Sequence, residues 1–209
     1  SFFEGMDLRI IDSNHVRQFY HSNPLKHLAV KTKKNIIGVL KSFYGRYRNL
    51  GNIEFPSPNL GDKVIRWIDE SEQLDIMECI PEYHHPIFEF LLFTGCRPAE
   101  ARALQWWDVD FKNNVITIRH NFSFRKFRKT TKGKKERVIP IHSQLLPVLK
   151  SLPRYPDISF VFINPMNQKG KYYGENGLSD IWNKAVKQAG YGYVRLYNGT
   201  RHSFASQLL

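Results

Sequence analysis

TGCRPAE, residues 94–100, is the first of three basic motifs in this sequence and the most informative about its fold. Pro98 suits the first position of a helix and biases Arg97 away from helical backbone, while Glu100 falls at the third helical position. The motif therefore predicts that Arg97 stands at a helix N-terminus, where free N–H groups and a guanidinium can bind a phosphate. Taken alone, the simpler interpretation, an ordinary arginine beside a proline, has more weight, so the surrounding sequence must decide.

Apolar residues at helical spacing lie on both sides of this motif, with a strand-like region between them. The predicted helices cover Asp69–Ile80, Pro86–Phe93, Pro98–Trp106, Ser143–Leu152, Leu178–Ala189 and the stretch from about Thr200 to the end. β-Branched and aromatic runs at Val115–Phe124 and Arg137–Ile141 predict a hairpin or small antiparallel sheet, and a short strand is expected near Phe160–Ile163. The predicted fold class is α+β, mostly helical.

The segment GNIEFPSPNLG, Gly51–Gly61, is the best candidate for a linker because Pro, Gly and Asn interrupt helical patterning there. Before it, one helix from Ser13 to Tyr20, capped by Ser13, and a second capped by Thr32 make the first part all-helical. We therefore expect a helical domain over residues 1–58 and a mixed domain over residues 59–209.

The composition favours a polyanionic partner. The formal net charge is +12, from 31 Lys and Arg against 19 Asp and Glu, and Lys and Arg gain affinity by releasing counterions from phosphates. Nucleic acid is the favoured partner and an anionic membrane the second candidate. No apolar run approaches the roughly 18 to 20 residues of a spanning helix, and no signal-peptide pattern opens the chain. A cytoplasmic protein is expected. Lys33, Lys34 and Lys41, around the second helix, fit a DNA-lining surface and a solvated face about equally.

Neither a disulfide scaffold nor a metal site is expected. The only cysteines are Cys79 and Cys96, and they form no CxxC pair and no Cys/His array with zinc spacing.

The second basic motif is TTKGKKERVIP, residues 130–140. From Arg119 to Arg137 the chain carries nine Lys and Arg against the single acid Glu136, a net charge of +8 in 19 residues. Interleaved phenylalanines favour a structured hairpin, although a basic solvated turn is the alternative. Such a tip can place one lysine against a leaving oxygen as general acid, and Lys132 is the candidate. The other residues expected to bind DNA are Arg125, Lys126, Arg128, Lys129, Lys134 and Lys135.

The third motif is NGTRHSFA, residues 198–205. In a helix, Asn198, Arg201 and His202 would share a face that could meet a phosphate, while Phe204 and Leu208 would anchor the opposite stripe. For each residue singly, a plain Asn-Gly turn and a hydrogen-bonded core histidine have about half the weight.

With these three motifs in order, the chain resembles the tyrosine recombinases of the phage integrase family over essentially its whole length. The resemblance implies that residues 1–58 are the later part of a helical core-binding domain and residues 59–209 a catalytic domain. It also implies that Arg97 is the first catalytic arginine, supported by Glu100, that Lys132 is the hairpin lysine, that Arg201 is the second arginine and that His202 is the histidine that often follows it.

Asn198 departs from the family pattern, which usually has histidine there. An asparagine can donate a hydrogen bond to a phosphate oxygen but cannot exchange a proton near neutral pH, which puts an acid–base role at this position in doubt.

The resemblance implies a reaction without cofactor or metal. A tyrosine attacks the scissile phosphate to form a 3′-phosphotyrosyl link, the arginines neutralise the charge on the nonbridging oxygens, and the lysine protonates the departing 5′ oxygen. It further implies double-stranded DNA as partner, a homotetramer on DNA when complete, accessory DNA-bending proteins, and a bacterial or phage-encoded mobile-element protein at the nucleoid.

The family's nucleophilic tyrosine lies downstream of the second arginine motif, which predicts a nucleophile beyond Leu209 and a chain inactive by itself. The alternatives are a DNA-binding remnant without catalysis and an enzyme like the type IB topoisomerases, which shares the arginine and lysine chemistry.

Overall fold

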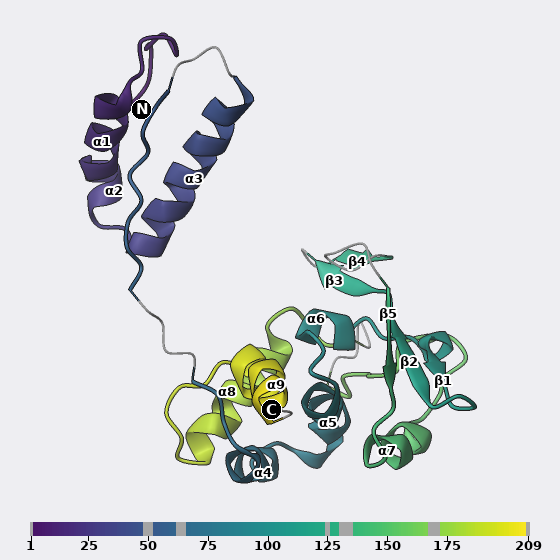
Figure 1. The fold of residues 1–209 in the computed structure, drawn as a ribbon. Coiled ribbons are helices and arrows are strands. Elements are labelled where there is room, and N and C mark those ends of the chain that lie inside the picture. The colour runs from purple at the N-terminus through teal and green to yellow at the C-terminus, as the bar shows by residue number, and fades with distance from the viewer. Residues whose placement is uncertain are drawn as a thin grey trace. The chain divides into compact units, whose positions relative to one another are not determined.

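The computed structural model describes residues 2–47, 52–61, 66–123, 126–129, 136–166 and 172–207. The chain forms two compact units, Ser1–Val64 and Ile65–Leu209 (Figure 1). The predicted boundary after residue 58 falls within the last residues of the first unit. In the described part of the chain, no helix is both long enough and apolar enough to cross a membrane.

In its described residues, the first unit contains the helices α1 (Ser13–His21), α2 (Asn23–Lys26) and α3 (Val30–Arg46). Its core contains Ile11, Val16, Ile37 and Tyr44. The cap of α1 is Asp12, whose Oδ1 accepts the His15 N–H at 2.9 Å, so the prediction that Ser13 caps this helix was wrong. The prediction that Thr32 caps the next helix was also wrong, because α3 begins at Val30 and has no side-chain cap.

The segment predicted as a linker is packed over part of its length. Residues 52–61 contain no helix or strand, yet Ile53 and Phe55 pack on the core of the first unit, with Phe55 6.0 Å from the Tyr44 ring. The Glu54 N–H donates to Ser13 Oγ at 2.9 Å, and in Figure 1 the segment runs alongside α3. Apolar residues on each side of Glu54 therefore tie this stretch to the helices before it.

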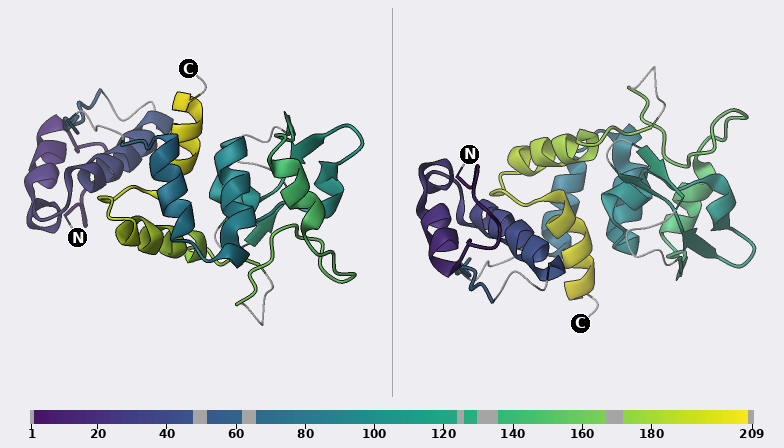
Figure 2. Two further views of the ribbon diagram at one scale, coloured as in Figure 1. Left: turned by 90° about the horizontal axis from the view of Figure 1, so that it is seen from below. Right: turned by 90° about the horizontal axis from the view of Figure 1, so that it is seen from above.

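The second unit is organised around the apolar helix α5, which packs against α7 and against the turn η4 and α9. The two views of Figure 2 show α5 between the sheet on one side and α4, α8 and α9 on the other. The helices of this unit are α4 (Glu70–Glu78), η2 (Glu82–His84), α5 (His85–Thr94), α6 (Pro98–Ala101), η3 (Trp106–Asp108), α7 (Leu145–Ser151), α8 (Gly177–Gln188), η4 (Asn198–His202) and α9 (Ser203–Gln207).

The helix after the first motif is much shorter than predicted. It ends at Ala101 instead of Trp106, and Trp106–Asp108 form a separate 3-10 turn. The chain leaves the helix because Leu104 O accepts the Val161 N–H at 3.0 Å and the Trp106 N–H donates to Ser159 O at 2.9 Å, contacts that sequence periodicity cannot show.

The sheet has the order β1 (Val109–Asp110), β2 (Val115–Ile118), β5 (Arg137–Pro140), and all its pairs are antiparallel. A separate ribbon pairs β3 (Asn121–Ser123) with β4 (Lys126–Arg128). The small antiparallel sheet was predicted, but the run from Val115 is broken at Arg119 and His120, which lie in neither β2 nor β3. Near the strand expected at Phe160–Ile163, the structure has the isolated bridge of Phe160 to Gln105.

The third motif forms a π-helical turn, η4, followed by α9. The wider π turn bonds each residue to the one five positions on, so spacings of three and four no longer ensure one shared face. The α+β, mostly helical fold class is confirmed.

Candidate active site

The turn between α5 and α6 sets the geometry of the first motif. Gly95 ends α5 in the left-handed conformation, with φ of +58°, and its N–H donates to Leu91 O at 3.0 Å. A side chain at Gly95 would also collide with Phe204, because a Cβ would lie 2.6 Å from that ring. Thr94 Oγ1 accepts the Cys96 N–H at 3.2 Å and fixes the next peptide. The backbone therefore delivers Arg97 in one defined orientation.

Glu100 is the polar centre of the site, with its side chain only 1% exposed. Its Oε2 accepts the Arg97 N–H at 3.0 Å and its Oε1 accepts Arg97 Nη1 at 3.0 Å. Arg137 binds the same carboxylate, from Nη1 to Oε1 at 3.1 Å and from Nη2 to Oε2 at 2.6 Å. Burial alone would raise the pKa of Glu100, but hydrogen bonds from Arg137 and from Arg97 hold that pKa below its usual value.

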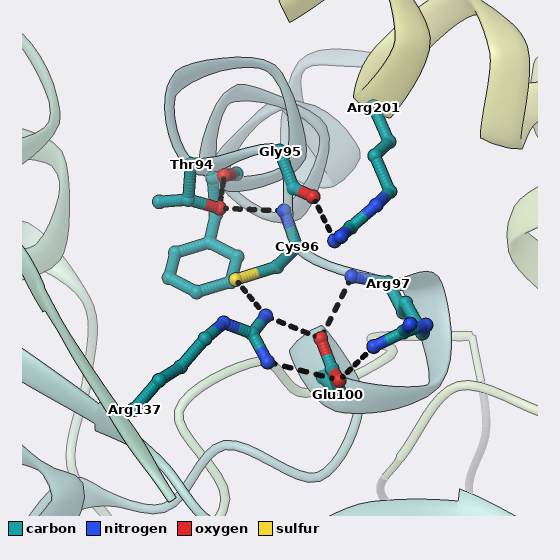
Figure 3. Close-up of polar contacts among 8 residues, drawn as sticks. Thr94, Gly95, Cys96, Arg97, Glu100, Arg137 and Arg201 are labelled. Carbon is teal, nitrogen blue, oxygen red and sulfur yellow. Dashed lines mark hydrogen bonds and ion pairs between the residues drawn. The ribbon is translucent and has the colours of Figure 1, made fainter. Parts of the chain in front are cut away.

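Arg201 reaches the same turn from the third motif. Its Nη1 donates to Gly95 O at 2.8 Å, so residues 106 positions apart are joined by one hydrogen bond. Figure 3 shows Arg97, Arg137 and Arg201 around the Gly95–Arg97 turn and Glu100. Two arginines expected at the site, Arg97 and Arg201, are thus brought together, and a third joins them.

The turn η4 that carries Arg201 is held by buried contacts. A Cβ at Gly199 would lie 2.3 Å from the ring of buried Trp182, so this position accepts only glycine without rearrangement. Gln73 Nε2 donates to Gly199 O at 3.3 Å, and Thr200 Oγ1 donates to Leu196 O at 2.8 Å. This packing fixes the base of the Arg201 side chain.

The other polar residues of the third motif have different neighbours. The Asn198 carbonyl accepts the Ser203 hydroxyl at 3.1 Å, and the Asn198 side chain is half-buried. His202 packs edge to face on Tyr197, with ring centroids 5.2 Å apart.

Arg137 was not predicted as a site residue. Among the nine Lys and Arg from Arg119 to Arg137, no signal in the sequence shows that the side chain of Arg137 pairs with Glu100. Its strand position was predicted, but its partner lies 37 residues away in the sequence.

Part of the predicted basic hairpin can be described. Lys126, Arg128 and Lys129 are exposed, while Phe127 between them packs on Phe122 with centroids 5.8 Å apart. Arg125, Lys132, Lys134 and Lys135 lie outside the described residues. The described ribbon therefore presents basic side chains outward from an aromatic base.

A second buried carboxylate, Asp108, contacts the first two residues of the basic stretch, Arg119 and His120. Arg119 Nε lies 2.8 Å from its Oδ1 as an ion pair rather than a well-directed hydrogen bond. His120 Nδ1 is 3.1 Å from Oδ2, which also accepts the Gln105 N–H at 3.2 Å. Arg119 and Arg137 both form internal ion pairs. Two of the positive charges that give this stretch its net charge of +8 are therefore paired within the protein.

The lysines predicted to bind DNA in the first unit lie on α3. Lys34 and Lys41 are exposed, whereas Lys33 is partly buried with its Nζ 5.3 Å from the centre of the Tyr20 ring. The 17 residues of α3 include no acidic residue. Lys31, Lys34 and Arg46 border a groove of about 710 Å³ on this helix.

Tyr191, upstream of the third motif, is poorly suited to attack a phosphate. Its hydroxyl donates to Asp75, and this hydrogen bond raises the pKa of Tyr191 to about 12.

Comparisons with known proteins place the chain near phage integrases. The model of the phage integrase family matches residues 62–209. The chain is 28% identical to the integrase of Shigella phage Sf6, over 72% of this chain and 40% of that protein. It is 27% identical to prophage integrase IntS of Escherichia coli K12, again over 72% and 40% of the two chains. The chain thus spans about two fifths of the length of these relatives.

Solved structures share the fold. The Tn1549 transposon integrase, in complex with a circular intermediate DNA, matches 96% of this chain and 73% of its own with a TM-score of 0.73 and 18% identity. The XerH site-specific recombinase bound to difH substrate matches 97% and 61% with a TM-score of 0.66 and 22% identity.

Proposed function

The chain belongs to the phage integrase family, and on this premise we propose that it carries the phosphate-activating part of a site-specific DNA recombinase. In the proposed reaction, DNA is cut and rejoined through a 3′-phosphotyrosyl link.

The observation that carries this proposal is the convergence of Arg97 and Arg201 on one turn. A phosphoryl transition state spreads negative charge over its nonbridging oxygens, and fixed guanidinium groups can neutralise that charge with directed hydrogen bonds. Arg97 is 40% exposed and Arg201 is partly exposed, so both can meet a ligand from solvent. The two arginines can bind the scissile phosphate without a metal.

Lys132 is proposed to protonate the departing 5′ oxygen. The support is positional, since Lys132 lies in the sequence between β4 and β5, and Arg137, the first residue of β5, contacts Glu100. An ammonium held beside the leaving oxygen acts as general acid.

Asn198 and His202 are proposed to assist at the phosphate, each by donating a hydrogen bond. The histidine usual at position 198 can exchange a proton near neutral pH and asparagine cannot, so proton transfer there is not part of the proposal.

Double-stranded DNA is the proposed partner of both units. Residues 1–58 would act as part of a core-binding domain, with the basic, acid-free α3 against the duplex, and residues 59–209 as a catalytic domain. The solved relatives bound to DNA support this choice.

Assembly as a homotetramer on DNA, help from DNA-bending proteins and a place at the nucleoid are extensions of the same proposal. The proposed phosphate contacts are Lys33, Lys34, Lys41, Arg125, Lys126, Arg128, Lys129, Lys134 and Lys135.

The test is covalent capture by the complete gene product on a nicked suicide duplex. Arg97→Ala and Arg201→Ala should each lower the rate of adduct formation on the order of 100-fold to 1000-fold, as for loss of a transition-state donor. Arg154→Gln is the control, because this guanidinium stacks 4.4 Å from the Trp106 ring, and it should leave the rate unchanged. Unchanged adduct yield in both site variants would refute the assignment.

The second candidate is a DNA-binding protein that occupies sites without cutting them, and Asn198 in place of histidine is the observation that favours it. Tight duplex binding with no adduct from the complete gene product would support it. DNA relaxation without recombinant product would instead indicate a topoisomerase activity.

A further inference from the structure

Arg137 joins the basic segment to the arginine site. It is the first residue of β5, and its register partner on β2 is Ile118, so it lies where the segment containing Lys132 returns to the sheet. From this point its side chain extends to Glu100 and to Cys96 (Figure 3). One residue therefore belongs to the strand at the base of the hairpin and to the cluster around Arg97.

The contact with Glu100 fixes both carboxylate oxygens. Nη1 donates to Oε1 at 3.1 Å and Nη2 to Oε2 at 2.6 Å, which is the two-pronged geometry of a guanidinium on a carboxylate. Nη2 also approaches Cys96 Sγ at 3.5 Å. Because Cys96 lies between Gly95 and Arg97, Arg137 holds the turn as well as the helix that follows it.

The oxygens that Arg137 fixes are the same two that accept from Arg97. Oε2 receives the Arg97 N–H and Oε1 receives Arg97 Nη1, both at 3.0 Å. A long side chain with 40% exposure gains a preferred position only from such a contact. The orientation of the Arg97 guanidinium thus depends on a carboxylate whose own orientation depends on Arg137.

The charges of Arg97, Glu100 and Arg137 also support a positioning role for Arg137. If Glu100 faced Arg97 alone, the carboxylate would cancel the positive charge that a phosphate needs. With Arg137 present, two guanidinium groups against one carboxylate leave a net charge of +1, so Arg97 stays oriented by Glu100 and still attracts an anion.

We infer that Arg137 is a positioning residue for Arg97, acting through Glu100 and through the turn at Cys96. The inference rests on the proposed function only in taking Arg97 as a ligand of the scissile phosphate. It adds that the orientation of Arg97 depends on the residue that begins β5.

The first test measures Arg97 itself in this chain without DNA. Hydrogen exchange at the Arg97 Nη1–H, the group that donates to Glu100 Oε1, should be at least about tenfold faster by NMR in Arg137→Met than in the wild type. Arg137→Lys, which keeps the charge but not the two-pronged contact, should be intermediate. Arg119→Met is a matched control, because Arg119 and Arg137 both have 35% exposed side chains and both pair with a carboxylate that is 1% exposed.

The control should leave Arg97 exchange at the wild-type value. Unchanged exchange in Arg137→Met, or equal acceleration in Arg119→Met, would overturn the inference. If Arg137→Met does not fold, the comparison of Arg137→Lys with Arg119→Lys decides in the same way.

The second test uses the complete gene product on the suicide duplex at saturating DNA. Arg137→Met should slow adduct formation about tenfold, while its Kd for the duplex stays within about twofold of the wild-type value. A lost affinity with an unchanged rate at saturation would contradict positioning. If the wild-type protein forms no adduct, the proposed function fails, and the exchange of Arg97 still decides on Arg137.

Discussion

Two carboxylates in the second unit, Glu100 and Asp108, look alike by burial and charge but differ in what they hold. Each side chain is 1% exposed and each pairs with an arginine that is 35% exposed. Glu100 accepts four hydrogen bonds from two arginines, Arg97 and Arg137. Asp108 accepts from the Gln105 backbone and contacts His120 and Arg119, at the start of a strand ribbon.

Burial and charge alone therefore do not show whether a carboxylate has a functional role. The second residue that contacts the carboxylate, beside its arginine partner, separates the two cases. Removing a charge from either pair leaves an uncompensated partner and destabilises the fold. At Glu100, however, the second partner is Arg97, a candidate phosphate ligand, whereas at Asp108 it is His120, which packs 5.0 Å from Phe127 inside the aromatic base of the ribbon. We therefore interpret Glu100 as coupled to chemistry and Asp108 as structural.

The largest effect is expected from truncating these carboxylates. Glu100→Ala should lower the free energy of unfolding by about 3 kcal/mol, because it leaves Arg137 half-buried without its partner. Asp108→Ala should lower it by about 2 kcal/mol, since the lost contacts are fewer and one of them is poorly directed. Urea unfolding curves measure both, and a larger loss at Asp108 would reverse the comparison.

Isosteric neutral variants should separate chemistry from stability. In Glu100→Gln the amide still accepts one hydrogen bond but loses the charge, so adduct formation by the complete gene product should fall about tenfold. Asp108→Asn should change the rate by no more than about twofold. Single-turnover rates on a suicide duplex measure this contrast, and equal losses would show that both carboxylates act alike.

The pH dependence of stability should also differ. The folded pKa of Glu100 is lowered, so the stability that its ionisation contributes is complete above its unfolded pKa of about 4.3 and is lost as the pH falls through the lower folded pKa. The difference in unfolding free energy between wild type and Glu100→Gln should therefore shrink as the pH falls below about 4. Denaturant titrations between pH 3 and pH 6 test this, and a difference that grows on acidification would contradict it.

The smallest effect is expected at His120. His120→Asn removes the contact with Asp108 Oδ2 and should lower the unfolding free energy by about 1 kcal/mol, the size of one hydrogen bond. The hydrogen exchange of the Arg97 Nη1–H, which donates to Glu100, should stay at its wild-type rate. A change at Arg97 would mean that the two carboxylates are coupled through the sheet.

Much of the fold was predictable because helices and strands follow local periodicity. The helices at α4, α5, α7 and α8 were placed within a few residues, and the pairing of β2 with β5 followed from the two runs of β-branched residues. The predicted helix past Ala101 was wrong because backbone bonds to residues 159 and 161 redirect the chain. Asn198, Arg201 and His202 were expected to share one face of an α-helix. The stretch instead forms a π turn packed on Trp182, in which spacings of three and four do not ensure a common face.

The sequence by itself determined the family of this protein through three motifs: an arginine before a proline, a strongly basic segment and a second arginine motif, in the order of the phage integrase family. These are local patterns, so they can be recognised one after another along the chain. Only the tertiary structure decided which charges meet, joining Arg201 to Gly95 and turning Arg137 inward to Glu100. All arginines carry the same charge in the sequence, and only packing distinguishes Arg97, Arg119 and Arg137, which pair with buried carboxylates, from exposed ones such as Arg128.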